Sequence, residues 1–443
     1  MRLTIVGGGG FRVPLIFRAL ADDPEPVIDE LVLYDTDAGR LRRIGAVIEA
    51  MSADRIGPSV RLETDLAAAV AGTDFVFQAI RVGGVAGRVC DERAALDVGL
   101  LGQETTGAGG VCYGLRTVPV VLRIAETIRR VAPDAWVINF TNPAGLVTEA
   151  ARSVLGDRVI GICDSPVGLF RRAARALGVR PEDAEFSYAG LNHLGWLRRL
   201  TVDGVDRLPE LLASEPLLDR VEEGRLFGGD WLRTLGAIPN EYLWYWYATA
   251  DAIAAIGGGA ETRGEYLARQ QDHYFTGDDH DPLRRWEETR RAREETYLAE
   301  EREATGAGDR DDDDLAGGGY EGVALDLIRA IARDRAARLV LNVRNGGTLA
   351  GLDDDAVVEV PCEVGSAGPR PLPAEPLEPY QQGIVITMKD VERTVIEAAR
   401  TGSRSLAVRA LALHPLVDSV RQARLIIDRQ LADVPELRQV LIN

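Results

Sequence analysis

Short apolar runs and amphipathic stretches alternate along the first part of the chain. The run Arg2 to Val6 predicts a β-strand, and the apolar-periodic stretch Val13 to Leu20 predicts a helix. Gly7 to Gly10 form a turn between them, and Leu31 to Tyr34 predict a second strand. Together these segments predict a strand–helix–strand unit of the kind that builds parallel sheets.

The same alternation continues to about residue 185. Strand-like runs at Phe75 to Ile80, Trp136 to Asn139 and Val159 to Ile162 are separated by helical stretches such as Val118 to Val131. Strands that alternate with helices form a parallel sheet with helices on both faces. The sequence therefore predicts an α/β fold.

The glycine turn has the features of a dinucleotide-binding loop. Gly7 and Gly9 occupy the first two positions of the pattern G-x-G-x-x-G, whereas Arg12 stands at the third. Asp35, 26 residues after Gly9, ends the second strand, where a carboxylate accepts hydrogen bonds from a ribose and repels a 2′-phosphate. NAD is thus favoured over NADP, and a turn that binds no ligand is the alternative. The residues expected at the cofactor are Gly7, Gly9, Gly10, Phe11 and Asp35.

The pattern changes near Ser187 to mixed strands and long helices, including a polar-faced helix over Leu283 to Glu303. We therefore expect a Rossmann-like dinucleotide-binding domain over 1–185 and a mixed α+β domain over 186–443. The segment Gly306 to Gly319 contains four consecutive aspartates between glycines. Such charge runs are usually solvated, so we interpret it as a loop and not as a metal site.

Composition limits the classes of partner. The 443 residues carry a formal net charge of −18, with 46% hydrophobic and 27% charged residues, which is typical of a globular protein. This charge repels nucleic acid and anionic membranes, so an anionic substrate requires a local cationic pocket. The first residues run directly into a strand, which argues against a cleavable leader. Four cysteines in so long a chain indicate no disulfide framework and favour the cytoplasm.

Six motifs in order then change the expected reaction. They are IRVGG (80–84), LGQETTGAGG (101–110), NFTNPAG (139–145), GICDSP (161–166), GLNHLGW (190–196) and IPNEYLWYWY (238–247). With these motifs the sequence resembles glycoside hydrolase family 4, and NVRNGG (342–347) and VVEVPC (357–362) resemble the carboxy-terminal half of that family. The resemblance implies cleavage of 6-phospho-sugar glycosides with bound NAD and a divalent metal, usually manganese.

The resemblance also implies a redox mechanism without net oxidation. NAD takes hydride from C3 of the sugar, Tyr242 removes the proton at C2, and the C1 leaving group is expelled. Water then adds and the hydride returns. Asp164 is implied as the general acid that protonates the leaving oxygen, although Asp is also a favoured helix N-cap residue.

The remaining roles come from the same resemblance. Cys163 and His193 are implied as the metal ligands, because a thiolate and a neutral imidazole bind first-row divalent ions. Arg81 and Arg263 are implied at the 6-phosphate, where guanidinium groups pair well with phosphate oxygens. Asn142 is implied as a ligand of substrate hydroxyls, and Glu104 is implied to orient the metal or the substrate hydroxyls.

The anomer preference stays open at this point. Asp164, directly after the metal cysteine, resembles the 6-phospho-α-glucosidases, whereas RVGG-x-x-GR and LGQETTGAGG resemble the β-acting group, which we favour. The expected substrate is a phosphorylated disaccharide or another 6-phospho-glucoside. The family also implies a homodimer or homotetramer. The alternative enzyme is an NAD-dependent hydroxy-acid or sugar-phosphate dehydrogenase. A third hypothesis is a non-catalytic protein that senses NAD.

Overall fold

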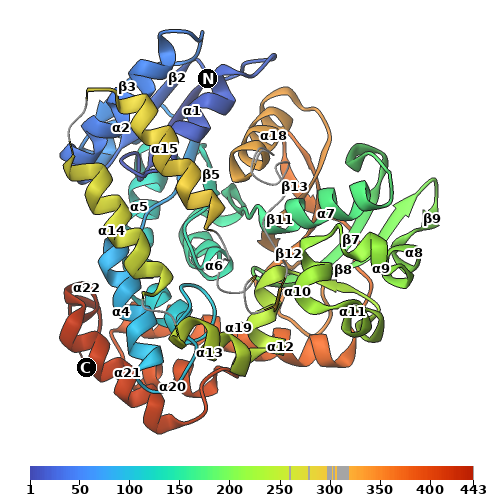
Figure 1. Ribbon diagram of the computed structural model, residues 1–443. Helices are drawn as coiled ribbons and strands as arrows, with labels where there is room; N and C mark the ends of the chain where they lie inside the picture. The colour runs from blue at the N-terminus through green and yellow to red at the C-terminus, as the bar shows by residue number, and fades with distance from the viewer. Residues whose placement is uncertain (259–260, 278–279, 297–301, 303–304, 307–318, 443) are drawn as a thin grey trace.

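One mixed β-sheet runs through the computed structural model, which describes residues 1–442 apart from 259–260, 278–279, 297–301, 303–304 and 307–318 (Figure 1). Its first half consists of parallel strands in the order β3-β2-β1-β4-β5-β6. These strands are β3 (Ser59–Glu63), β2 (Glu30–Tyr34), β1 (Arg2–Val6), β4 (Phe75–Gln78), β5 (Trp136–Asn139) and β6 (Val159–Gly161). This is the strand order of dinucleotide-binding folds, so the predicted α/β class is confirmed.

Seven helices accompany the parallel strands within this part of the chain. They are α1 (Val13–Ala21), α2 (Ala38–Ser52), α3 (Leu66–Val70), α4 (Gly84–Leu96), α5 (Ala108–Val131), α6 (Ala144–Leu155) and α7 (Ser165–Ala176). The helix predicted from Val118 begins ten residues earlier, inside the motif LGQETTGAGG. Gly109 and Gly110 explain this start, because a Cβ there would lie 2.0 Å from the Gln103 carbonyl oxygen and 2.2 Å from that of Thr105. Glycine marks a close backbone approach here and not a turn.

Antiparallel strands from the chain after residue 184 extend the sheet beyond β6. In order these are β11 (Ala337–Arg344), β12 (Val357–Gly365), β7 (Glu185–Leu191), β8 (Leu194–Val202) and β10 (Ile238–Pro239), with β13 (Gly368–Pro371) beside β12 and β9 (Val205–Asp206) beside β8. The hairpin β11–β12 therefore lies between β6 and β7, which are neighbours in sequence. The division of the chain at residue 185 stays a prediction.

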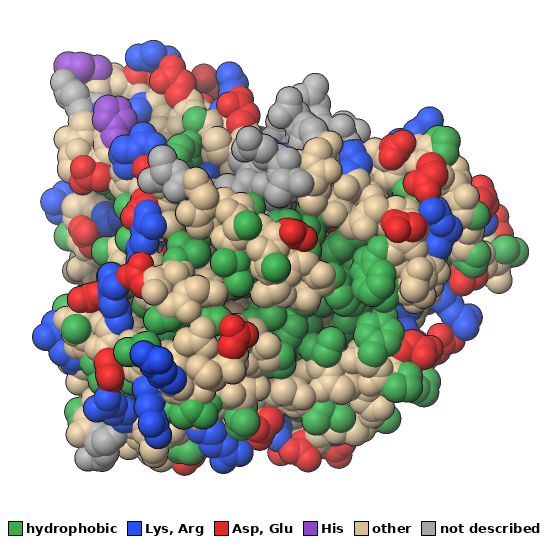
Figure 2. Space-filling model, turned by 60° about the horizontal axis from the view of Figure 1, so that its bottom comes forward, with side chains coloured by type: hydrophobic (Ala, Val, Ile, Leu, Met, Phe, Trp, Pro, Cys, Tyr) green, Lys and Arg blue, Asp and Glu red, His purple; other side chains and the backbone are tan. Residues whose placement is uncertain are grey.

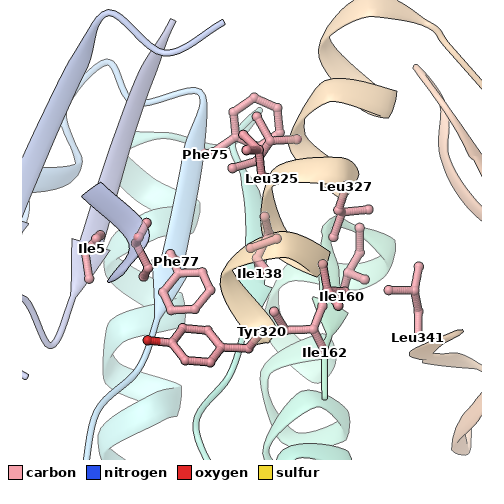
Figure 3. Packing of buried hydrophobic residues seen from close by; sticks show 14 of the residues in the cluster. Ile5, Phe75, Phe77, Ile138, Ile160, Ile162, Tyr320, Leu325, Leu327 and Leu341 are labelled. Atoms are coloured by element: carbon pink, nitrogen blue, oxygen red, sulfur yellow. The ribbon is translucent and has the colours of Figure 1, made fainter. Parts of the chain in front are cut away.

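Alternate strand residues pack against opposite helical layers. Ile138 and Ile160 face the helix α18 (Tyr320–Arg333), as Figure 3 shows, whereas Val137 and Val159 belong to the cluster that packs against α5. The ring of Tyr320 stacks on Phe140 with centroids 4.1 Å apart. Strands buried on both faces explain the continuous apolar runs in the sequence.

Further helices cover the sheet and its ends. They are α8 (Leu208–Ala213), α9 (Glu215–Leu218), α10 (Glu222–Phe227), α11 (Gly229–Leu235), α12 (Trp244–Tyr247), α13 (Thr249–Gly258), α14 (Arg263–Thr276) and α15 (Pro282–Glu295). The helix predicted over Leu283 to Glu303 corresponds to α15, and part of its remainder falls outside the described residues. The same holds for the expected aspartate loop, of which residues 307–318 are not described.

The carboxy-terminal helices lie along the bottom of Figure 1 and pack against α5. They are α19 (Pro379–Thr401), α20 (Arg404–Leu413), α21 (Val420–Asp433) and α22 (Pro435–Val440). Lys389 of α19 is the only lysine in the sequence, and it is buried with its ammonium group donating to Glu149 Oε2 at 2.9 Å and to Glu392. A membrane-crossing helix, long and apolar enough to span a bilayer, is not found among the described residues.

Candidate active site

A cavity of about 750 Å³ opens where the carboxyl ends of the parallel strands meet residues from the second half of the chain. Arg81, Asn142 and Cys163 follow β4, β5 and β6. Eight residues predicted from the sequence lie on its wall, namely Arg81, Glu104, Asn142, Cys163, Asp164, His193, Tyr242 and Arg263. The fold therefore brings these residues to one site, while their individual roles stay predictions.

Cys163 and His193 form a close pair. The Sγ atom of Cys163 lies 3.6 Å from Nε2 of His193, and Thr105 Oγ1 lies 3.0 Å from the other ring nitrogen, Nδ1. Both side chains are buried. Burial lowers the pKa of His193 to about 3, so the imidazole is neutral at physiological pH. Burial, together with the nearby Glu359 and Asp164, raises the pKa of the Cys163 thiol.

This pair fits a divalent metal ion. A neutral imidazole and a deprotonated thiol are both metal ligands, and Thr105 orients the ring so that Nε2 faces the sulfur. Among the described residues no cluster of three or more His, Cys, Asp or Glu side chains forms a complete protein metal site. Two protein ligands leave the remaining coordination positions to groups from outside the chain, as in catalytic metal sites.

The hairpin β11–β12 lies between the two strands, β6 and β7, that lead to Cys163 and His193. Asn342 of β11 pairs with Gly161 of β6 on one side and with Glu359 of β12 on the other, and Glu359 in turn pairs with Gly190 of β7. Gly161 and Gly190 lie two residues before Cys163 and three before His193. The hairpin thus fixes the separation of the strand ends from which Cys163 and His193 follow.

Glu359 holds the turn that presents the histidine. Its Oε1 accepts hydrogen bonds from Asn192 at 3.1 Å and Asn342 at 2.9 Å, and its Oε2 accepts one from Tyr188 at 3.1 Å. His193 has a φ of 61°, a left-handed conformation that is unfavourable for a residue with a Cβ. The anchored Asn192 supports this conformation. The motifs NVRNGG and VVEVPC contained Asn342 and Glu359, but sequence reasoning gave neither residue a role.

Tyr242 lies directly on the histidine. Its ring stacks on the His193 ring with centroids 3.7 Å apart and planes 2° from parallel. Asn240 begins the short 3₁₀ helix η3 (Glu241–Leu243) and accepts a hydrogen bond from the Tyr242 amide through Oδ1 at 3.0 Å. The phenol is therefore carried by a capped turn, whereas the following residues Trp244 and Tyr245 are buried.

Asp164 precedes α7 at the N-cap position. Its side chain makes no capping hydrogen bond, and the residue lies on the cavity wall beside Cys163. The residue type alone also suggested that the Asp164 side chain caps the helix, but it does not cap α7 here. A carboxyl group on this wall is available for proton transfer.

Glu104 is paired with two arginines. It accepts from Arg81 and, through Oε2, from Arg88 Nη1 at 2.6 Å. Burial alone would raise the pKa of Glu104, but the two guanidinium groups outweigh burial and lower it to about 2. Glu104 is consequently ionised at any physiological pH, and it orients Arg81 at the cavity wall.

Four guanidinium groups converge on one part of the cavity. Burial and the charges of Arg12, Arg81 and Arg263 lower the pKa of Arg293 to about 9. Arg263 donates to the Arg293 carbonyl oxygen at 3.0 Å. Positive charge therefore predominates around Arg293, although Arg81 pairs with Glu104 and Arg12 with Glu294. This part of the cavity suits an anion, and its use as the phosphate site stays a prediction. Sequence reasoning missed Arg12, which occupies a glycine position of the fingerprint, and Arg293, which stands in a run of charged helical residues.

The glycine turn fits a dinucleotide. Gly7 has a φ of 101°, and a Cβ on it would lie 2.5 Å from the Ala79 carbonyl oxygen, so only glycine is accommodated. Asp35 Oδ2 accepts a hydrogen bond from the Gly9 amide at 2.9 Å, which places the acidic group beside the turn. The turn leads into α1, whose N-terminal amides favour a pyrophosphate.

Phe11, also predicted at the cofactor, has a different environment from the glycines. Its ring lies 5.1 Å from the Tyr274 ring and 6.1 Å from the Trp286 ring, and its carbonyl oxygen accepts a hydrogen bond from Trp286 Nε1 at 2.8 Å. The side chain therefore packs under α14 and α15. Any contact that Phe11 makes with a cofactor stays a prediction.

The fold and the cavity together define an enzyme built on a dinucleotide-binding sheet. Residues 2–179 match the profile of the family 4 glycosyl hydrolases, and residues 188–417 match the profile of the family 4 glycosyl hydrolase C-terminal domain. The chain belongs to this family, and the resemblance found in the motifs is confirmed.

Relatives of both anomer classes are similar to the chain. Maltose-6'-phosphate glucosidase from Bacillus subtilis is 31% identical over 96% of this chain and 94% of its own length. The 6-phospho-alpha-glucosidase of Leptotrichia buccalis is 31% identical over 96% of each. The solved 6-phospho-beta glucosidase of Thermotoga maritima, with manganese, NAD+ and glucose-6-phosphate, has a TM-score of 0.82 at 28% identity and covers 99% of both chains.

Proposed function

We propose that the protein hydrolyses 6-phospho-glucosides with the help of NAD and a divalent metal ion, and that this ion is manganese. The observation that carries this proposal is the single cavity in which Tyr242 stacks on His193, His193 faces Cys163, and Arg293 lies among further guanidinium groups. A dehydrogenase of a simple hydroxy acid requires neither this metal pair nor an additional aromatic base. The similar solved structure contains NAD, manganese and a sugar phosphate.

Different parts of the cavity bind the substrate, the metal ion and the nucleotide. Arg81 and Arg263 bind the 6-phosphate, and Asn142 both donates to and accepts from substrate hydroxyls. When bound, NAD supplies reversible hydride transfer at C3, and the divalent ion at Cys163 and His193 supplies Lewis acidity. The nucleotide is held by the glycine turn with Asp35 at its ribose, which favours NAD over NADP.

Two residues move protons. Tyr242 removes the proton from C2 of the oxidised sugar, and its place on the face of a buried, neutral imidazole keeps its oxygen near the metal-binding pair. Asp164 gives a proton to the leaving oxygen, because its carboxyl group lies on the cavity wall without a capping role. Loss of the leaving group, addition of water across C1 and C2, and return of the hydride to C3 would then complete hydrolysis with no net oxidation.

For the anomer, we propose a 6-phospho-β-glucosidase. The support is the pair of motifs RVGG-x-x-GR and LGQETTGAGG, which lie against the metal pair through Thr105 and against the phosphate site through Arg81. A 6-phospho-α-glucosidase is the alternative, because Asp164 directly follows Cys163. The named relatives include both specificities.

We also propose a homodimer or homotetramer in the cytoplasm. Figure 2 shows hydrophobic side chains gathered on one face of the molecule, and exposed large side chains on the described residues include Trp231, Tyr380 and Ile386. All four cysteines are free, which suits a reducing compartment. Light scattering after size exclusion measures the oligomer directly, and a monomer at micromolar concentration would overturn this proposal.

One assay tests the function. Purified protein with NAD and manganese is given the p-nitrophenyl 6-phospho-glucosides of both anomers, and p-nitrophenol and NADH are followed together. The expected result is release of p-nitrophenol from the β-anomer without accumulation of NADH, and incorporation of deuterium at C2 in deuterium oxide. Stoichiometric NADH would indicate the dehydrogenase. Cleavage without NAD and without label at C2 would overturn the mechanism.

A further inference from the structure

Two buried carboxylates on the cavity wall have no role in the mechanism above. Glu222 and Glu241 are only 4% and 7% exposed, and both line the cavity. Within the described part of the chain, Glu222 Oε1 and Glu241 Oε2 have no hydrogen-bond partner. An unpartnered buried carboxylate oxygen is costly, so its retention indicates a polar ligand.

These carboxylates lie on the side of the cavity where the leaving group is protonated. Ser165 Oγ donates to Glu241 Oε1 at 2.6 Å, and Ser165 directly follows Asp164. Glu241 also directly precedes Tyr242 in η3. Glu241 is thus adjacent to both residues to which the proposed function gives a proton, so a group attached at C1 of the sugar would extend toward it.

Charge selects the chemistry of this ligand. Arg172 Nη1 lies 3.5 Å from Glu222 Oε2, and its Nε donates to Glu223 Oε2 at 3.1 Å, so this arginine already compensates carboxylates. Glu222 and Glu223 thus compensate the charge of Arg172, which leaves this arginine no net attraction for a second phosphate or carboxylate. Hydroxyl groups, which both donate and accept, are favoured at Glu222 and Glu241.

We propose that Glu222 and Glu241 form a leaving-group subsite that binds the hydroxyls of a second sugar. The inference rests on the proposed function, because it assigns the part of the substrate beyond the cleaved bond. Burial, with the charge of Glu223, raises the pKa of Glu241 to about 8, so its carboxyl group also carries a proton at neutral pH. A group that both donates and accepts is suited to a sugar hydroxyl.

Two substrates that share the 6-phospho-glucosyl group and differ in the leaving group provide the test. One is a 6′-phosphorylated disaccharide with the linkage that the wild type cleaves, and the other is the matching p-nitrophenyl 6-phospho-glucoside. In Glu241→Met and Glu222→Met, which remove every hydrogen-bonding atom at nearly the same side-chain length, we expect kcat/KM for the disaccharide to fall at least tenfold further than for the aryl substrate, as for the loss of one hydrogen bond. Asp219→Met is the matched control, because it makes the same kind of change at an exposed carboxylate close to α10.

A second measurement starts from the wild type, and this first part does not depend on how the variants fold. Disaccharide phosphates that lack single hydroxyls on the leaving sugar are given to the wild type, and at least one deletion should cost about tenfold. That deletion should cost nothing further in Glu241→Met or Glu222→Met, where the hydrogen bond is already absent. Equal losses for the disaccharide and the aryl substrate, or no loss with any deoxy sugar, would overturn the subsite. A wild type that cleaves neither substrate would instead overturn the proposed function.

Discussion

The ring of Tyr242 lies flat on the ring of His193, with centroids 3.7 Å apart and planes 2° from parallel. A residue expected to remove a proton is thus held by a residue expected to bind the metal. Because the two rings form one unit, a change that tilts the histidine also displaces the phenol. The contact therefore couples the metal site to the base by packing.

Replacing Tyr242 by Phe should abolish proton removal and keep the stack. The ring remains and only the hydroxyl is lost, so we expect kcat to fall by about 10² to 10⁴-fold. Binding of NAD, measured by fluorescence titration, should stay close to that of the wild type. A variant that retains more than a tenth of wild-type kcat would show that another group is the base.

The metal should be removable and should depend on Cys163. A thiolate and manganese are a soft and a hard partner, so the affinity is modest and a chelator should remove the ion and the activity. In Cys163→Ser we expect Mn²⁺ binding, followed by electron paramagnetic resonance on the protein without substrate, to weaken by at least tenfold. Cys362→Ser changes a buried thiol outside the cavity and serves as the control. Full activity in excess chelator would contradict the assignment.

Recognition of the phosphate should depend on the arginine cluster. In Arg263→Gln the substrate loses a charge-assisted contact, and we expect kcat/KM for a 6-phospho-glucoside to fall by at least about tenfold. The wild type should prefer the phosphorylated over the unphosphorylated glucoside by at least about 100-fold, and the variant should narrow this ratio. Equal rates for both glucosides in the wild type would rule out a phosphate pocket.

Glu359 should make the stability of the fold depend on pH. Burial raises its pKa from 4.5 to about 7, although its three hydrogen-bond donors act in the opposite direction. The folded state therefore binds this proton more tightly than the unfolded state. The stabilisation is complete below pH 4.5 and is lost as the pH rises toward 7, by at most about 3 kcal/mol.

The isosteric variant isolates this contribution. Glu359→Gln keeps an acceptor for Asn192 and Asn342 and has no acidic proton to lose. Its free energy of unfolding, measured in urea between pH 4.5 and 8, should decline less with pH than that of the wild type. Parallel curves for both proteins would show that Glu359 does not titrate in this range.

The local elements were predictable from the sequence because their signals are local. The run Arg2 to Val6 became β1 without change, and the glycine turn leads into α1 as expected. The motifs also identified the cavity wall, since residues such as Cys163 and His193 are recognisable in their sequence contexts. In each case the determining neighbours lie within a few positions along the chain.

The features that escaped prediction depend on contacts between distant segments. The insertion of β11–β12 between β6 and β7 rests on single paired positions such as Asn342 with Gly161, which no periodicity encodes. Arg293 reaches the cavity wall, close to Arg12, Arg81 and Arg263, only when its helix folds over the cavity. The start of α5 could not be predicted, because glycines usually indicate turns. Here Gly109 and Gly110 instead permit close packing of the backbone.

The isolated lysine has a practical consequence for anyone who handles the protein. Lys389 is 3% exposed and donates hydrogen bonds to Glu149 and Glu392, and the sequence contains no other lysine. Reagents that acylate amines should therefore modify no lysine side chain of the folded protein, and they should react at Lys389 only when the carboxy-terminal helices open. Acylation of Lys389, followed by mass spectrometry, would then serve as a chemical reporter of unfolding in this region.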